Sequence, residues 1–227
     1  MKKIILFSGA GMSAESGLKT FRDNNGLWEN YRVKDVATPE AWQADPELVL
    51  QFYNARRKQL LNAIPNPAHL LIKKLEEKFD VTVITQNIDD LHERAASKNV
   101  IHLHGELKKV RSEKFEHLVY DWPKAELNLG ELCERGAQLR PHVVWFGEEV
   151  PMMAKALEIA ASAEILIVVG TSLNVYPAAN VAFSASKKCK NYLIDPNPPA
   201  LGEESNFTVI KAGAEEGILL LMRKLSA

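Results

Sequence analysis

Short apolar runs alternate with longer mixed stretches along the chain. The runs are rich in Val, Ile and Leu and occur at Ile4–Phe7, Val81–Thr85, Val100–Leu103, Val143–Phe146, Glu164–Gly170, Asn191–Asp195 and Phe207–Lys211. Continuous runs of this kind are typical of strands that are covered on both faces. Helices are expected at Pro46–Ala63, Pro67–Phe79, Pro151–Ala161, Pro177–Lys188 and Ala214–Leu225, several of which have proline near the first turn. This alternation predicts the α/β class with a doubly wound parallel sheet.

Two stretches interrupt the alternation. From about residue 20 to residue 64, a polar-aromatic loop and a helix stand where a second strand would be expected, and residues 106–140 are charged and weakly periodic. We expect these insertions to form a smaller lobe of a single domain, 1–227. The sheet would then occupy about 1–20, 65–105 and 141–227, and the lobe about 21–64 and 106–140.

Composition excludes several classes of protein. The 227 residues are 46% hydrophobic and 25% charged, which argues against disorder, collagen and coiled coil. A net charge of −1 gives no electrostatic signal for nucleic acid or an anionic membrane. The first apolar run stops at Ser8, shorter than the ~7–15 residues of a signal-peptide core. The two cysteines, Cys133 and Cys189, lie far apart and indicate a reducing compartment. We therefore expect a cytoplasmic protein.

A glycine loop follows the first predicted strand. Gly9, Gly11 and Ala14 match a GxGxxA pattern, whose backbone can approach a pyrophosphate closely. The alternative is an ordinary tight turn between a strand and a helix. A dehydrogenase would continue into a second strand with an acidic residue ~20 residues after the glycines. Here residues 20–28 are a polar loop with aromatic residues, which we interpret as a lid. The pattern therefore argues against an oxidoreductase.

Polar residues also follow other predicted strands. They are Gln86, Asn87 and Asp89 after one strand, His104 after the next, and Gly170, Thr171 and Ser172 after a third. In open α/β sheets, ligands bind at the carboxyl ends of the strands, so these groups together with the first glycine loop predict a dinucleotide site. His104 titrates near neutrality, as a general base should. Strand alternation directs His102 to the opposite face, where we expect it to serve in packing.

These residues, in this order, resemble the sirtuin family of NAD-dependent protein deacylases. The matching segments are GAGMSAESGLKTFRD, TQNIDDLH, HLHGEL, LRPHVVWFGE and GTSLNVYPAA, and the resemblance covers nearly the whole chain. It implies a Rossmann-like part, a small lobe, and a cleft that holds NAD and an acylated lysine. It also implies a reaction in which the substrate's amide oxygen attacks C1′ of the nicotinamide ribose. NAD is consumed, and nicotinamide, free lysine and O-acyl-ADP-ribose leave.

The resemblance implies roles for individual residues. His104 would accept a proton from a ribose hydroxyl, Asn87 would act beside it, and Asp89 would favour the positive charge that develops on the ribose. The NAD site would comprise Gly9, Ala10, Gly11, Ser13, Glu15, Phe21, Arg22, Gln86, Asn87, Ile88, Asp89, Gly170, Thr171, Ser172, Asp195, Asn197 and Ala214. Val144, Phe146, Gly147 and Glu148 would clamp the substrate backbone as an extended strand.

The sequence departs from the family pattern in two places. The family usually holds a structural zinc on four cysteines, but residues 106–140 contain only Cys133. The corresponding positions here are Ser112, Phe115, Leu132 and Arg135, so we predict no metal. Packing by Leu118, Tyr120, Trp122, Leu127 and Leu129 is expected to hold the lobe instead. The second departure is Asp195, where the family usually has asparagine, so its contact with the adenosine ribose is an open question.

Tyr53 and Arg56 bear on the acyl group. Residues three apart share a helix face, and a phenol with a guanidinium suits a carboxylate. The YxxR pattern resembles the sirtuin class that removes succinyl and malonyl groups. The alternative is a packed tyrosine and an arginine that extends to water. We predict that succinyl- and malonyl-lysine are preferred over acetyl-lysine, and that Arg57 faces water.

Three other functions fit parts of the pattern. An NAD glycohydrolase of the same fold would need no acyl-lysine clamp, so Val144–Glu148 and the Tyr53/Arg56 pair argue against it. An ADP-ribosyltransferase would be recognised by the transfer of label to protein. A non-catalytic NAD-binding module would not need both His104 and Asn87. The sequence does not indicate the oligomeric state.

Overall fold

A six-stranded parallel sheet forms the main layer of the molecule. The computed structural model describes residues 1–19, 27–28, 31–202 and 205–226. The sheet has the order β11-β10-β9-β1-β4-β5, and all neighbouring strands are parallel. Its strands are β1 (Lys3–Ser8), β4 (Asp80–Thr85), β5 (Val100–His102), β9 (Ile165–Val169), β10 (Lys190–Ile194) and β11 (Phe207–Ile210).

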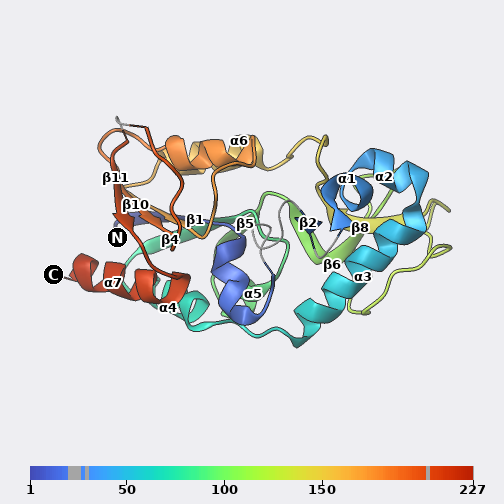
Figure 1. The fold of residues 1–227 in the computed structure, drawn as a ribbon, viewed down its shortest axis with the longest axis horizontal. Helices are drawn as coiled ribbons and strands as arrows, with labels where there is room; N and C mark the ends of the chain where they lie inside the picture. Colours follow the sequence, from blue (N-terminus) through green and yellow to red (C-terminus); the bar gives the residue numbers. More distant parts are fainter. Residues whose placement is uncertain (20–26, 29–30, 203–204, 227) are drawn as a thin grey trace.

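Helices cover both faces of this sheet. Helix α6 (Met153–Ala161) lies on one face, and α4 (Pro67–Leu75) and α7 (Ala214–Ser226) lie on the other (Figure 1). Alternate residues of β1 point to opposite faces of the sheet. Ile5 packs on the face covered by α6, and Leu6 packs on the face covered by α4 and α7. The prediction of a doubly wound parallel sheet is confirmed.

A second, antiparallel sheet lies at the other end of the molecule (Figure 1). It has the order β7-β6-β8, with strands β6 (Gly105–Ser112), β7 (Val119–Asp121) and β8 (Leu139–Val143). Helices α1 (Val33–Val36), α2 (Pro39–Ala44) and α3 (Pro46–Asn62) pack beside it. The remaining elements are the 3-10 helices η1 (Ala10–Ser16) and η2 (Ala178–Phe183), helix α5 (Leu91–Arg94) and the pair β2 (Leu27–Trp28) and β3 (Tyr31–Arg32). Asp45 begins α3 by accepting a hydrogen bond from the Leu48 amide, and Pro46 fits the first turn.

Several predicted element bounds were wrong. The strand expected at Val143–Phe146 is β8, which runs from Leu139 to Val143 and pairs with β6 instead of joining the parallel sheet. The helix expected over Pro177–Lys188 is the short 3-10 helix η2. Helix α4 ends at Leu75 rather than Phe79, and α6 begins at Met153. The residues beyond these ends form turns or irregular backbone, which the pattern of apolar residues and prolines does not mark.

The antiparallel sheet has its own small core. Leu118, Tyr120, Trp122 and Leu127 pack there around Val110 and Leu139, as expected for a lobe held by packing. The prediction for Leu129 was wrong, because its side chain is 50% exposed beside the turn at Gly130.

The positions corresponding to the family's zinc ligands make other contacts. The Ser112 hydroxyl accepts hydrogen bonds from the Phe115 amide at 3.2 Å and from the Cys133 thiol at 3.4 Å. The Arg135 guanidinium lies 4.9 Å from the centroid of the Phe115 ring. Within the residues that the structure describes, no three His, Cys, Asp or Glu side chains are grouped so that they could hold a metal ion. The described helices also include none that is long and apolar enough to span a membrane.

Candidate active site

One cavity of about 630 Å³ lies where the carboxyl ends of the parallel strands face the antiparallel sheet. Every described residue that the sequence analysis assigned to catalysis, to NAD or to the substrate lines it. Phe21 and Arg22 lie outside the described residues. The residues that the structure brings together are Gly9, Ala10, Gly11, Ser13, Glu15, Tyr53, Arg56, Gln86, Asn87, Ile88, Asp89, His104, Val144, Phe146, Gly147, Glu148, Gly170, Thr171, Ser172, Asp195, Asn197 and Ala214.

Two glycine loops meet at the floor of the cavity. The Gly11 amide donates to the Gly170 carbonyl at 2.9 Å. A Cβ atom on Gly11 would lie 2.6 Å from the Gly170 Cα atom, and one on Gly9 would lie 2.8 Å from the Gly170 oxygen. Gly170 also has a φ of +61°, which favours glycine. The loops therefore touch only because these residues are glycines, and they leave bare backbone that a phosphate group can approach closely.

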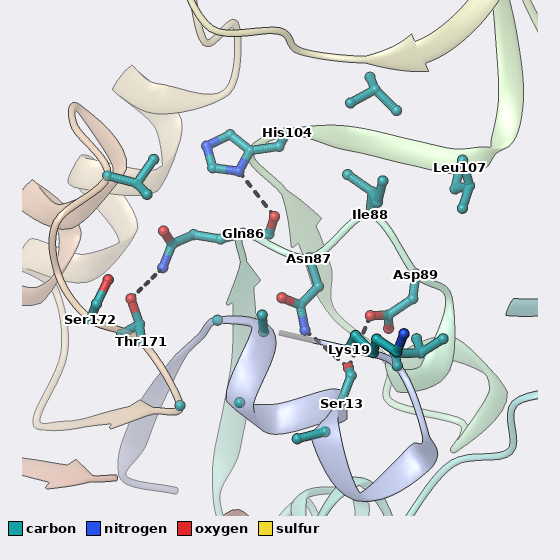
Figure 2. Close-up of a pocket in the computed structure, with 18 of the residues that line it drawn as sticks. Ser13, Lys19, Gln86, Asn87, Ile88, Asp89, His104, Leu107, Thr171 and Ser172 are labelled. Atoms are coloured by element: carbon teal, nitrogen blue, oxygen red, sulfur yellow. Dashed lines mark hydrogen bonds between the residues drawn. The ribbon is translucent and has the colours of Figure 1, made fainter. Parts of the chain in front are cut away.

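A chain of hydrogen bonds joins Asn87, Ser13 and Asp89 (Figure 2). The Asn87 side-chain amide donates to the Ser13 hydroxyl at 3.0 Å, and that hydroxyl donates to the Asp89 carboxylate at 2.9 Å. Burial raises the pKa of Asp89 above its ordinary 3.8, although hydrogen bonds from Ser13 and from the Leu91 amide oppose the shift. A carboxylate whose charge is costly to bury is stabilised by a positive charge beside it, so this part of the cavity favours a ligand that carries one.

His104 follows β5, and its ring points into the cavity beside Gln86 (Figure 2). Its Nδ1 atom lies 3.0 Å from the backbone oxygen of Gln86, so Nδ1 carries the proton and Nε2 has the lone pair in the neutral ring. Burial lowers the pKa of His104 below its ordinary 6.5, and the hydrogen bond to Gln86 opposes this only in part. The ring is therefore neutral at neutral pH and able to accept a proton.

His102 does more than the packing we expected. Its Nδ1 atom lies 3.0 Å from the backbone oxygen of Asn87, and its Nε2 atom lies 2.8 Å from the Glu93 carboxylate. Burial lowers the pKa of His102, but the hydrogen bond and the charge of Glu93 raise it by more. The pKa of His102 therefore lies above its ordinary 6.5. His102 does not line the cavity, so the expected structural role holds, but alternation gave only the face of the strand and not the two hydrogen-bond partners there. The sequence feature that could have indicated a polar role for His102 is its position two residues before His104 in the segment HLHG.

Helix α3 contributes Tyr53 and Arg56 to the cavity wall. Tyr53 is fully buried, and its hydroxyl accepts a hydrogen bond from the Trp145 indole at 3.1 Å. The prediction that Arg57 faces water was wrong, since its exposed fraction is 0%. Arg57 donates to the Leu107 carbonyl at 3.0 Å, because β6 packs against this face of α3.

The segment after β8 forms another wall. The Val144 amide donates to the His104 carbonyl at 2.9 Å, and the Phe146 amide donates to the Ala37 carbonyl at 3.0 Å. The Glu148 carboxylate accepts from Arg140 at 2.6 Å and from Arg111 at 3.1 Å. These amides and this carboxylate therefore bind within the protein. The backbone carbonyls of this segment and the half-exposed Phe146 side chain are available for contacts with a ligand.

The far end of the cavity follows β10. Asp195 is buried, and its carboxylate accepts a hydrogen bond from the Asn197 amide at 2.8 Å. The turn before Ala214 packs closely against η1. A Cβ atom added at Gly213 would lie only 2.8 Å from a carboxylate oxygen of Glu15 in η1.

The fold and the cavity together define an α/β protein with a dinucleotide-type cleft between a parallel sheet and a smaller antiparallel sheet. The Sir2 family model matches residues 9–177, and the chain belongs to this family. A protein of Helicobacter pylori strain J99, named NAD-dependent protein deacylase, is 50% identical over 225 residues, covering 99% of this chain and 96% of that protein. One of Bacteroides thetaiotaomicron with the same name is 49% identical, covering 96% of this chain and 95% of the relative.

Solved structures show the same similarity. The crystal structure of a Sir2 homolog–NAD complex has a TM-score of 0.90 and 38% sequence identity, covering 99% of this chain and 90% of that chain. A mutant Sir2 homologue in complex with ADP-ribose has a TM-score of 0.88 and 36% identity, covering 99% and 94%.

Proposed function

We propose that this chain is an NAD-dependent protein-lysine deacylase that prefers succinyl and malonyl groups to acetyl. The observation that carries the acyl preference is that Tyr53 and Arg56 line the same cavity as His104. The names of the Helicobacter and Bacteroides relatives support the NAD-dependent deacylation. Nicotinamide, the free lysine and O-acyl-ADP-ribose would be the products.

The cavity fits NAD. Gly9, Gly11 and Gly170 line the cavity with backbone that carries no side chain, which suits close approach of the pyrophosphate. Asn87 and Asp89 offer a donor and an acceptor for the nicotinamide ribose, and Asp195 offers acceptors for the adenosine ribose. When bound, NAD supplies the ribose that receives the acyl group. The buried Asp89 carboxylate would favour the positively charged nicotinamide end.

His104 is the proposed proton acceptor. Its neutral ring has Nε2 available as a base, because Nδ1 donates to Gln86. The Val144 amide holds the His104 carbonyl, so the same contact links the base to the segment proposed to bind the peptide. The acylated lysine would enter as an extended strand along Val144–Glu148, and the carbonyls of that segment would accept hydrogen bonds from the peptide.

Tyr53 and Arg56 are the proposed binding groups for the acyl carboxylate. A guanidinium and a phenol form charge-assisted hydrogen bonds to a carboxylate, which are stronger than neutral ones. An acetyl group offers no such partner. A site built to bind a charged group discriminates strongly against a ligand that lacks the charge, because that ligand forms none of the charge-assisted hydrogen bonds.

Matched acetyl-, malonyl- and succinyl-lysine peptides, incubated with NAD and weighed after reaction, test the proposal. We expect Arg56→Met to lower kcat/KM for the succinyl peptide about 100-fold or more while deacetylation is largely kept. Lys58→Met is the matched control, because Lys58 lies on the same helix but is exposed and paired with Glu126. An equal loss of both activities in Arg56→Met would overturn the acyl assignment.

Three further measurements test the proposal against the other functions and against the assigned base. Release of nicotinamide at full rate without any acylated peptide would favour an NAD glycohydrolase. Transfer of label from NAD to protein would favour an ADP-ribosyltransferase. Unchanged turnover in His104→Ala would remove the proposed base.

A further inference from the structure

Trp145 lies between the proposed acyl-binding residue Tyr53 and the ion pair of Arg140 with Glu148. We infer that Trp145 is a positioning residue, which orients the Tyr53 hydroxyl so that it donates to the carboxylate of an acidic acyl group. The inference rests on the proposed acyl preference and goes beyond it, because it assigns part of the specificity to a residue that need not touch the acyl group.

The direction of the hydrogen bond between these residues is fixed by chemistry. An indole N–H can only donate, so in the 3.1 Å contact the Tyr53 oxygen is the acceptor. The hydroxyl proton of Tyr53 is therefore directed away from Trp145. A carboxylate can only accept, so recognition of an acidic acyl group requires Tyr53 to donate to it. The indole N–H thus fixes the rotation of the Tyr53 hydroxyl so that its proton can be donated to a carboxylate.

The surroundings hold the indole in place. The Arg140 guanidinium lies 3.3 Å from the centroid of the Trp145 ring, and the Trp42 ring packs at a centroid distance of 5.7 Å. Arg140 is tied to Glu148 by two hydrogen bonds, of 2.6 and 3.0 Å. The Trp145 backbone amide also donates to Glu148 at 2.8 Å. Trp145 is only 2% exposed, so its side chain has lost its freedom before a substrate arrives.

The charges around Tyr53 are consistent with a donor role. Burial raises the pKa of Tyr53 well above 10, against smaller effects of the Trp145 hydrogen bond and of the charges of Arg56 and Arg140. The phenol therefore keeps its proton throughout the neutral range. Glu148 adds a negative charge to this group and also raises the pKa of Tyr53. In the cavity, Arg56 supplies the positive charge and Tyr53 the neutral donor.

A double-mutant cycle tests whether Trp145 acts through Tyr53. The variants are Trp145→Phe, which keeps an aromatic ring but has no N–H donor, Tyr53→Phe, and the combination of both. For each, kcat and KM are measured with succinyl- and acetyl-lysine peptides at saturating NAD, and Tm is recorded. We expect Trp145→Phe to lower the ratio of desuccinylation to deacetylation in kcat/KM about 5- to 10-fold, the effect of one neutral hydrogen bond. The KM for the succinyl peptide should rise.

The Tyr53→Phe background gives the decisive comparison. If Trp145 acts through the phenol, adding Trp145→Phe to Tyr53→Phe changes the ratio little, because the hydroxyl is already absent. An equal fall in both backgrounds, or no change in the ratio in Trp145→Phe alone, would overturn the inference. A wild-type enzyme without succinyl preference would instead overturn the proposed function itself.

A second variant covers the case in which Trp145→Phe does not fold. Arg140→Lys keeps the charge and the indole N–H but removes the planar group stacked on the ring. In the same cycle with Tyr53→Phe, a fall of the ratio only where Tyr53 is present supports the inference. Equal falls with and without the Tyr53 hydroxyl contradict it.

Discussion

His102 holds the backbone carbonyl of Asn87, with its Nδ1 atom 3.0 Å from that oxygen. His104, two residues later, binds the carbonyl of Gln86 in the same way at 3.0 Å. The Asn87 amide is held as well, since it donates to the Thr85 hydroxyl at 3.0 Å. The loop after β4, which carries the proposed ribose-binding residues, is therefore fixed at successive backbone groups before any ligand arrives.

The pair of His102 and Glu93 should make stability depend on pH. The net pKa of His102 is raised above 6.5, so its stabilising contribution is complete below that value and is lost as pH rises through the raised pKa. The pKa of Glu93 is lowered below 4.5, because the hydrogen bond and charge of His102 outweigh burial, so its contribution is lost as pH falls through that lower value. We expect the stability deficit of His102→Gln, measured by urea unfolding, to be largest between pH 4.5 and pH 6.5.

Glu93→Gln is the companion variant for that measurement, because it keeps a hydrogen-bonding side chain and removes the charge. The loss of unfolding free energy in Glu93→Gln should become smaller as pH rises through the raised pKa of His102, as it should in His102→Gln. A deficit that stays constant from acidic to alkaline pH in both variants would show that the two residues do not form a charged pair.

The pH dependence of the reaction should report His104. Burial lowers its pKa below 6.5, so the acid limb of the kcat/KM profile should lie below that pH. His104→Ala should lower turnover about 100-fold or more, which is the usual contribution of a general base. His102→Gln serves as the control, since it should keep the acid limb where the wild type has it. An acid limb at or above the ordinary value would contradict the assignment.

Periodicity in the sequence was enough to predict the parallel sheet. Ile4 and Leu6 pack to one side and Ile5 and Phe7 to the other, which is why a continuous apolar run is typical of a strand covered on both faces. The grouping of the polar loops followed from the same rule, because the carboxyl ends of parallel strands share one edge of the sheet.

The errors lie where a residue's surroundings come from distant parts of the chain. Arg57 looks like an exposed helix residue, but β6 brings the Leu107 carbonyl to it. His102 has its partners on Asn87 and Glu93, which no alternation rule names. In the run from Val143 to Phe146, Val143 and Trp145 pack in the core beside α3 and all four residues line the cavity, although β8 ends at Val143. The sequence around a residue does not show which distant segments of the chain contact it in the fold.

Arg57 should contribute to stability and Lys58 should not. The Arg57 guanidinium is buried, and it donates to the Leu107 carbonyl at 3.0 Å and to the Asn54 side-chain oxygen at 2.9 Å. Burial lowers its pKa to about 10, so it remains charged at neutral pH. Arg57→Met should cost about 1–3 kcal/mol, because the buried Leu107 carbonyl loses this donor and the Asn54 oxygen keeps only the Leu127 amide.

Lys58→Met provides the matched change on an exposed side chain and should alter the free energy of unfolding by no more than about 0.5 kcal/mol. Both values are measured by urea unfolding at neutral pH. Equal effects of the two variants would contradict the buried role of Arg57.

The core of the antiparallel sheet should be stable without metal. Leu127 is fully buried there, whereas Leu129 is 50% exposed. Leu127→Ala should cost about 2–5 kcal/mol in the free energy of unfolding, because it leaves a cavity in a small core. Leu129→Ala, the same chemical change at the surface, should stay within about 0.5 kcal/mol.

A chelator distinguishes packing from a metal as the source of that stability. Thermal unfolding of the wild type with and without the chelator should give the same Tm, since Ser112, Phe115 and Arg135 contact protein groups where the family has zinc ligands. A structural metal would instead add its binding free energy to folding, and removing it would lower Tm markedly. A lower Tm with the chelator, together with a small effect of Leu127→Ala, would show that a metal rather than this core holds the sheet together.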